Sequence, residues 1–251
     1  MAKSKSKALG RRQRLVIDRG VRWAVQIAFF VVFPAVFSAA FNGVKYVFTQ
    51  IGAMQPVSLS AFVTTLLAVL AFTVVFGRFF CGYACAFGTL GDALFTVFTP
   101  VRKKLGIGKK KPLLSVGMQR ALQLLKYVVL VVICVLCFAG MWSGVSGYSP
   151  WTAFAGIVAG NVDGISAGAF VALGVISVGM LFVERFFCQF LCPLGAVFSL
   201  LPVLPFSAFR RDATRCAKGC GLCKRSCPVS VSPDPDAFAA GECISCGRCA
   251  D

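Results

Sequence analysis

Residues 78–88 read RFFCGYACAFG, and the same pattern recurs as RFFCQFLCPLG at residues 185–195. Each copy places two cysteines four positions apart, directly after a long apolar segment. On a helix, residues i and i+4 lie on one face. The repeat therefore predicts a membrane domain made of two related helix pairs, with the two copies meeting at one surface.

Apolar segments dominate the sequence around this repeat. Hydrophobic residues make up 58% of the chain, charged residues only 14%, and the mean hydropathy is +0.81. Four apolar segments occupy residues 21–41, 57–80, 121–141 and 166–187. Each has about 20 residues or more, enough to cross a hydrocarbon core of roughly 30 Å. We expect a membrane all-α protein with four transmembrane helices.

Basic residues fall in three blocks that indicate orientation. Residues 1–20, residues 81–120 and the tail from residue 207 each hold seven Lys or Arg, whereas the other two loops share only Lys45. This asymmetry predicts that both termini and the middle loop are cytoplasmic. The net charge of +17 might otherwise suggest a nucleic-acid partner. No basic block is interleaved with aromatic residues that stack on bases, so we expect no nucleic acid.

Three regions follow from this pattern. Residues 1–20 form a basic cytoplasmic N-terminus, residues 21–206 the four-helix domain with its paired Cys-x3-Cys motifs, and residues 207–251 a cytoplasmic cysteine-rich segment. The absence of histidine excludes bis-His haem, His-ligated zinc and Rieske clusters. Seven of the thirteen cysteines lie in the last region. In the cytoplasm such cysteines bind metal rather than form disulfides.

The spacing of these seven cysteines is typical of a bacterial ferredoxin. The segment reads Cys216-x3-Cys220-x2-Cys223-x3-Cys227-Pro228, followed by Cys243-x2-Cys246-x2-Cys249. In two-cluster ferredoxins, the fourth cysteine of each run precedes a proline and ligates the other cluster. One complete [4Fe–4S] site is therefore predicted at Cys227, Cys243, Cys246 and Cys249.

A second [4Fe–4S] site would use Cys216, Cys220 and Cys223. Its fourth ligand is expected a few residues after Cys249, but the sequence ends at Asp251. We therefore interpret the ferredoxin-type segment as incomplete at its C-terminus. The first spacer of this site, three residues instead of two, also departs from the usual pattern.

Structural zinc is the alternative for the same segment. Cys220-x2-Cys223 and Cys243-x2-Cys246 fit a four-cysteine zinc ribbon. Zinc would leave three cysteines without a role, namely Cys216, Cys227 and Cys249. The Cys-Pro ending favours iron–sulfur clusters.

The paired cysteines of the repeat are a separate candidate site. Cys81 and Cys85 in the first copy, with Cys188 and Cys192 in the second, would present four thiolates at the cytoplasmic membrane surface. They could hold a further cluster or form a redox-active thiol centre. The alternative is that these small side chains only pack near helix ends.

Charged residues flank this candidate centre. Arg78 and Arg185, which begin the two copies, are expected to extend toward the lipid headgroups. Asp92 and Glu184 lie near the same boundary, and we expect each to form an ion pair. A proton-handling role at a quinone site is the alternative for these acids.

Taken together, these motifs resemble the NapH/NosR-type membrane polyferredoxins, a family of 4Fe–4S binding membrane proteins. Members combine a small helical membrane domain, two Cys-x3-Cys-Pro motifs and two C-terminal [4Fe–4S] runs. The motifs map to Cys81 and Cys85, and to Cys188, Cys192 and Pro193. Ala86 replaces the proline in the first copy, and the covalent-flavin signature of some relatives is absent.

The resemblance implies an electron-transfer subunit of an oxidoreductase system in a prokaryotic cytoplasmic membrane, and not a stand-alone enzyme. Such a subunit relays electrons between the quinone pool, or a cytoplasmic donor, and a partner reductase, ferredoxin-like protein or maturation system. A redox-sensing or assembly protein without steady electron flux is one alternative. A zinc-stabilised membrane scaffold is another.

Overall fold

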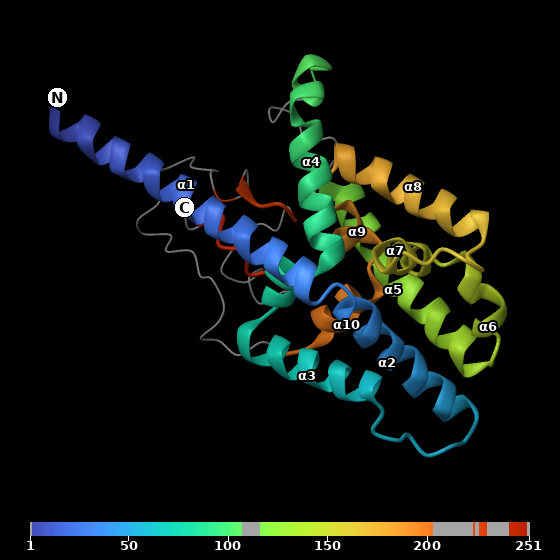
Figure 1. The fold of residues 1–251 in the computed structure, drawn as a ribbon. Helices are drawn as coiled ribbons and strands as arrows, with labels where there is room; N and C mark the ends of the chain where they lie inside the picture. Colours follow the sequence, from blue (N-terminus) through green and yellow to red (C-terminus); the bar gives the residue numbers. More distant parts are fainter. Residues whose placement is uncertain (1, 107–115, 203–222, 224–225, 230–240, 250–251) are drawn as a thin grey trace.

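A computed structural model describes residues 2–106, 116–202, 223, 226–229 and 241–249 (Figure 1). All regular structure within those ranges is helical, in agreement with the predicted all-α class. The elements in chain order are α1 (Ala2–Val32), α2 (Val36–Gly52), α3 (Ala61–Phe76), η1 (Phe80–Ala84), α4 (Ala86–Lys104), α5 (Val116–Phe138), α6 (Trp142–Val145), η2 (Ser146–Tyr148), α7 (Pro150–Ala159), α8 (Ala167–Phe182), α9 (Phe186–Phe190) and α10 (Pro193–Leu200).

The first predicted span is not one straight helix. It contains Pro34, which disfavours helical geometry at the residue before it and has no backbone N–H to donate. Helix α1 accordingly ends at Val32, α2 begins at Val36, and the pair is bent by 60° at this break. The first turns of α1 project away from the other helices (Figure 1).

Judged by length and composition alone, one helix in the described ranges can cross a membrane. It is α5, through its segment Ala121–Phe138, and the bent pair α1 and α2 would make a second if it counts as one span. Helices α3, α7 and α8 are apolar but shorter. The prediction of four spans therefore stays a prediction.

Aromatic side chains from several elements form the centre of the core. The rings of Phe37, Phe87 and Phe187 come from α2, α4 and α9 and pack on one another, with centroids 4.6–6.2 Å apart. Helix α4 packs against α8, and α10 packs against α5. Cys81 of η1 and Cys188 of α9, the first cysteine of each repeat copy, belong to the same buried cluster.

Candidate metal centre

The two repeat copies place their cysteines in similar local positions. Cys81 and Cys188 lie in short helical turns, η1 and α9. Cys85 and Cys192 each follow in an extended conformation, with φ/ψ of −74°/121° and −73°/110°, and cap the N-termini of α4 and α10. The second cysteine of each pair therefore lies at a helix N-terminus, where the helix dipole favours a thiolate.

Matched backbone hydrogen bonds close both turns. The N–H of Cys85 donates to the carbonyl of Phe80 at 2.9 Å, and the N–H of Cys192 donates to the carbonyl of Phe187 at 2.9 Å. These donors and acceptors are equivalent positions of the repeat. The copies thus close the turn before the second cysteine in the same way, although η1 is a π-helix, α9 is an α-helix, and Arg185 has a positive φ of 55°.

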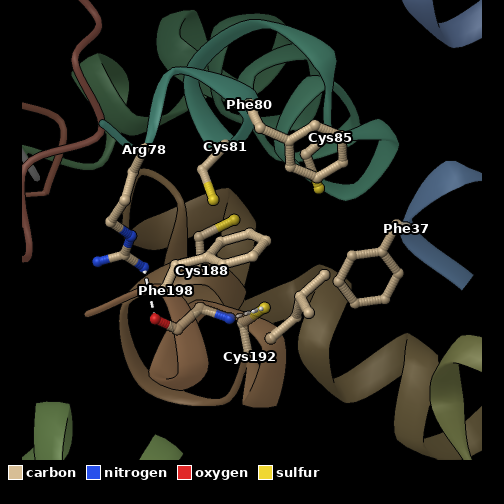
Figure 2. Close-up of a pocket in the computed structure, with 10 residues that line it drawn as sticks. Phe37, Arg78, Phe80, Cys81, Cys85, Cys188, Cys192 and Phe198 are labelled. Carbon is tan, nitrogen blue, oxygen red and sulfur yellow. Dashed lines mark hydrogen bonds between the residues drawn. The ribbon is translucent and has the colours of Figure 1, made fainter. Parts of the chain in front are cut away.

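The four cysteines converge on one small cavity (Figure 2). The sulfur atoms of Cys81 and Cys188 point toward each other, and those of Cys85 and Cys192 lie around the same space. All four are buried free thiols. The cavity is lined by Phe37, Arg78, Phe80, Cys81, Cys85, Cys188, Cys192, Leu194, Gly195 and Phe198. The structure therefore brings together the cysteines that the repeat pairs in sequence.

Burial raises the pKa of three of these thiols, Cys85, Cys188 and Cys192. It raises the pKa of Cys188 to about 11 despite the opposing charge of Arg185. The pKa values of Cys85 and Cys192 are raised further, by burial and then by neighbouring thiols. A metal that binds here would displace the protons, because a coordinating thiol is deprotonated.

The arginines of the repeat cross from one copy to the other. Arg78 Nη2 donates to the carbonyl of Gly195 at 3.0 Å. Arg185 donates to the carbonyls of Cys81 and Gly82 in the first copy. Both arginines are almost fully buried, at 2% and 1% exposure. The prediction that they extend to the headgroups is wrong, because each side chain is held inside the protein by backbone acceptors of the opposite copy.

Glycines leave room for this crossing. A Cβ on Gly88 would lie 3.1 Å from Nη1 of Arg185, and a Cβ on Gly195 would lie 3.0 Å from Nη2 of Arg78. These distances are shorter than ordinary van der Waals contact. The glycine that ends each copy therefore gives the opposite arginine its close approach to the cysteine turn.

Arg185 is neutralised inside the helical domain by Asp92 of α4. Its Nε and Nη2 donate to the two carboxylate oxygens at 2.9 and 2.7 Å. Gln26 and Arg22 donate to Oδ2 at 2.8 and 3.1 Å. Burial alone would raise the pKa of Asp92, but the charge and hydrogen bonds of Arg185 outweigh it and lower that pKa to about 2. The ion pair predicted for Asp92 is confirmed.

Arg78 instead forms its ion pair with a carboxylate of the C-terminal segment. Its Nη1 donates to the carbonyl of Gly241 at 2.7 Å and contacts Oε2 of Glu242 at 3.3 Å. The same carboxylate pairs with Lys126, whose side chain is fully buried on α5. Two cations of the helical domain therefore share one acid of the tail.

Sequence reasoning did not single out four members of these networks, namely Arg22, Gln26, Lys126 and Glu242. Arg22 and Gln26 stand four positions apart at the start of the first apolar segment, and Lys126 interrupts the third. A polar or ionisable residue inside an apolar span is the signal that could have identified the first three. Glu242 carries no signal beyond its position next to Cys243.

The described tail cysteines lie close to one another. The pKa of Cys249 is raised to about 11, first by burial and then by the thiols of Cys246, Cys243 and Cys227. These four residues are the predicted ligands of the complete ferredoxin-type site. Of the remaining predicted ligands, Cys223 is described, whereas Cys216 and Cys220 lie outside the described residues.

This cysteine segment packs against the first copy of the repeat. The carbonyl of Ile244 lies so close to Gly82 that a Cβ there would be 2.6 Å away. The hydroxyl of Tyr83 donates to the carbonyl of Cys246 at 3.3 Å. Ile244 itself is only 2% exposed. The tail is thus docked directly beside the turn that contains Cys81.

Two further contacts hold the tail to the second copy. Arg248 forms an ion pair with Glu184, which confirms the ion pair predicted for that acid. The side-chain amide of Gln189 donates to the carbonyl of Pro228 at 2.9 Å. Both copies therefore contribute to the docking surface.

The cavity is lined by four cysteine thiols and no histidine. Within the described ranges, no three His, Cys, Asp or Glu side chains are arranged to hold one metal ion. In a [4Fe–4S] cluster each cysteine binds a different iron, so the four sulfurs surround a larger group. Four buried cysteines line the cavity, and cysteine thiolates are the usual ligands of such clusters.

Comparisons with known proteins agree with this chemistry. A family model described as a 4Fe-4S binding domain matches residues 59–108 and 166–206, which include all four cysteines of the repeat. Uncharacterized protein MJ0749 of Methanocaldococcus jannaschii is 30% identical over 76% of this chain and 67% of its own length. No solved structure matches the chain significantly.

Two relatives have informative names. Ferredoxin-type protein NapH of Haemophilus influenzae is 28% identical over 73% of this chain and 62% of its own length. Regulatory protein NosR of Pseudomonas aeruginosa is 25% identical over 68% of this chain and 23% of its own length. With its 4Fe–4S binding domain and its two Cys-x3-Cys turns, this chain belongs to the NapH/NosR-type polyferredoxins.

Proposed function

We propose that the chain is a membrane-bound iron–sulfur electron-transfer subunit with both termini in the cytoplasm. It relays electrons between the quinone pool, or a cytoplasmic donor, and a partner reductase or maturation system. One observation carries the proposal: four cysteines from two repeat copies converge on a cavity beside the docked ferredoxin-type segment.

A membrane location is supported by the apolar surface of α5. Leu124, Val128, Val131 and Val135 are 55–63% exposed along the helix. A contiguous apolar face is unfavourable in water but is covered by lipid in a membrane. In a four-span arrangement α3 and α8, each 16 residues, are continued by the turns η1 and α9. Both cysteine pairs then lie at the same membrane boundary.

The paired cysteines are proposed to hold a redox centre. A [4Fe–4S] cluster there would accept and release single electrons. Phe37, Phe80 and Phe198 in the cavity wall exclude water. Arg78 and Arg185 donate to backbone carbonyls beside the cysteines, and their charges are balanced by Glu242 and Asp92.

The tail is proposed to hold the complete cluster at Cys227, Cys243, Cys246 and Cys249. The mutual proximity of these thiols supports the ferredoxin ligand set. A zinc ribbon would use Cys243 and Cys246 but would leave Cys249 without a role. The second ferredoxin site, at Cys216, Cys220 and Cys223, is proposed from its spacing alone.

The close approach of Gly82 and Ile244 supports the proposal that the two centres exchange electrons within the chain. The positive charge of the tail suits an acidic donor or acceptor protein. A redox-sensing role is the second candidate, since one relative is named a regulatory protein. Reduction of the clusters by quinol or a donor protein, followed by reoxidation, distinguishes steady relay from sensing.

The first test is metal analysis of protein purified without oxygen. We expect iron and acid-labile sulfide, and a loss of about four iron per chain in either the Cys81→Ser/Cys188→Ser or the Cys243→Ser/Cys246→Ser double variant. Cys134→Ser is the matched control, because Cys134 lies in α5 and does not line the cavity. Unchanged iron in the first double variant would refute the paired-cysteine centre. Zinc without labile sulfide would refute electron transfer altogether.

A further inference from the structure

We propose that Glu242 is a positioning residue that couples docking of the C-terminal segment to the paired-cysteine centre by supplying the counter-charge of Arg78. This inference rests on the proposed function, because it takes the four repeat cysteines as the ligands of a redox centre. Its basis is a difference between two equivalent arginines.

The two arginines of the repeat obtain their counter-charges from different places. Arg185 pairs with Asp92, which belongs to α4 of the helical domain. Among the ion pairs of the described residues, the carboxylate partner of Arg78 is Glu242, 164 positions away in the tail. The helical domain thus neutralises one of its crossed arginines and depends on the tail for the other.

Arg78 links the tail to the cavity that the four cysteines line. Its side chain is 2% exposed, lines the cavity and holds the carbonyl of Gly195. Gly195 in turn donates its N–H to Sγ of Cys192 at 3.2 Å. A continuous set of contacts therefore runs from Glu242 through Arg78 and Gly195 to one cysteine of the centre.

Lys126 strengthens the coupling. Its fully buried ammonium group pairs with the same carboxylate. If the tail undocks, both Lys126 and Arg78 lose their counter-charge in a buried site, which is strongly unfavourable. Docking of the tail and integrity of the cavity are consequently linked through Glu242.

The chain offers a matched control in Glu184. This acid pairs with Arg248 of the same tail segment, but it does not line the cavity or contact Arg78. Glu184→Gln therefore removes one docking ion pair and leaves the crossed arginines neutralised. Glu242→Gln removes a docking ion pair and the counter-charge of Arg78 together.

The test compares these two variants in the cluster-loaded protein, by hydrogen exchange and by redox titration followed by electron paramagnetic resonance. We expect Glu242→Gln to speed amide hydrogen exchange both in residues 79–88 and in residues 241–249. The expected increase is roughly tenfold or more, which corresponds to a loss of about 1.4 kcal/mol of contact free energy. Glu184→Gln speeds exchange in residues 241–249 only. The midpoint potential of the paired-cysteine centre rises in Glu242→Gln alone, because uncompensated positive charge favours the reduced state.

Equal behaviour of the two variants in residues 79–88 would overturn the inference, even if both loosen the tail. Equal midpoint potentials for the paired-cysteine centre would overturn it as well. Failure of the proposed function looks different: the Cys81→Ser/Cys188→Ser variant would then retain every resonance signal and all its iron. The hydrogen-exchange comparison would still decide whether Glu242 holds the tail to the repeat.

Discussion

The two repeat copies present their cysteines in similar turns and differ in surroundings. In both, a helical turn presents one cysteine, an extended residue presents the next, and an arginine reaches across to the other copy. Arg185 pairs with Asp92 of the same helical domain, whereas Arg78 pairs with Glu242 of the C-terminal segment. The sequence motif therefore determines the cysteine geometry, and residues distant in the chain determine its electrostatics.

The difference extends to single positions. Gly82 of the first copy corresponds to Gln189 of the second. At Gly82 the absence of a side chain lets the tail backbone approach closely, whereas Gln189 uses its amide to hold the carbonyl of Pro228. The first copy thus receives the tail by close packing and the second by hydrogen bonding.

Removing the fixed counter-charge is expected to have the largest effect. Asp92→Asn should lower the free energy of unfolding by about 3–5 kcal/mol, because it leaves the buried Arg185 without its charge partner. Denaturation in detergent, followed by helix content, measures this loss. Asp163→Asn, in the exposed loop before α8, is the control and should change stability by less than about 0.5 kcal/mol. Equal stability of the two variants would contradict the proposed asymmetry.

Conservative exchange of the crossed arginines should sharpen the comparison. Lysine keeps the charge but cannot donate in several directions from a planar group. Arg185→Lys, which loses part of a bidentate contact with Asp92, should cost about 2–3 kcal/mol, and Arg78→Lys about 1–2 kcal/mol. The same denaturation measurement applies. A larger cost at Arg78 would mean that the tail acid contributes more than Asp92.

The two docking modes can be separated at equivalent positions. Gly82→Ala places a Cβ against the carbonyl of Ile244 and should destabilise the docked tail by about 1–3 kcal/mol. Gln189→Ala leaves the carbonyl of Pro228 without its donor and should cost about 1 kcal/mol. Protease cleavage rates within the tail report both. A slower cleavage in Gly82→Ala than in wild type would contradict close packing at this position.

The smallest effect concerns the ionisation of Asp92. Its pKa in the folded protein, about 2, lies below the ordinary value of 3.8, so the ion pair contributes fully above pH 3.8 and is lost as the pH falls through 2. At pH 3 the carboxyl group should still be ionised. The infrared difference between wild type and Asp92→Asn then shows a carboxylate band. A protonated carboxyl band at pH 3 would disprove the pairing.

The helical class and the meeting of the cysteine pairs were predictable because both depend on local periodicity and on the repeat. The break at Pro34 was not predicted within the segment 21–41, although proline acts on its immediate neighbour. The contacts that Arg78 and Arg185 make inside the protein could not be predicted. A long cationic side chain near a membrane boundary can extend outward or turn inward, and the choice depends on acceptors more than 100 positions away in sequence.

The repeat predicted which cysteines meet at the cavity, but not the charged residues around them. Cysteine spacing identifies residues that can share a cluster, because the thiolates must reach it from one turn. The acids that accompany them have no fixed spacing. Asp92 pairs with Arg185 across 93 positions, and Glu242 pairs with Lys126 across 116. Such pairings arise from packing of the whole chain and leave no periodic trace in a single sequence.

The pair formed by Lys126 and Glu242 sets an order of events during synthesis. The ribosome makes the buried lysine 116 residues before its carboxylate, which at about 5–20 residues per second is a delay of roughly 6–23 s. Through that interval α5, an apolar helix, carries an unpaired cation. The last part of the ion pair to be translated is also the segment with the ferredoxin-type cysteines. Neutralisation of Lys126 therefore waits for the segment that contains the ferredoxin-type cysteines.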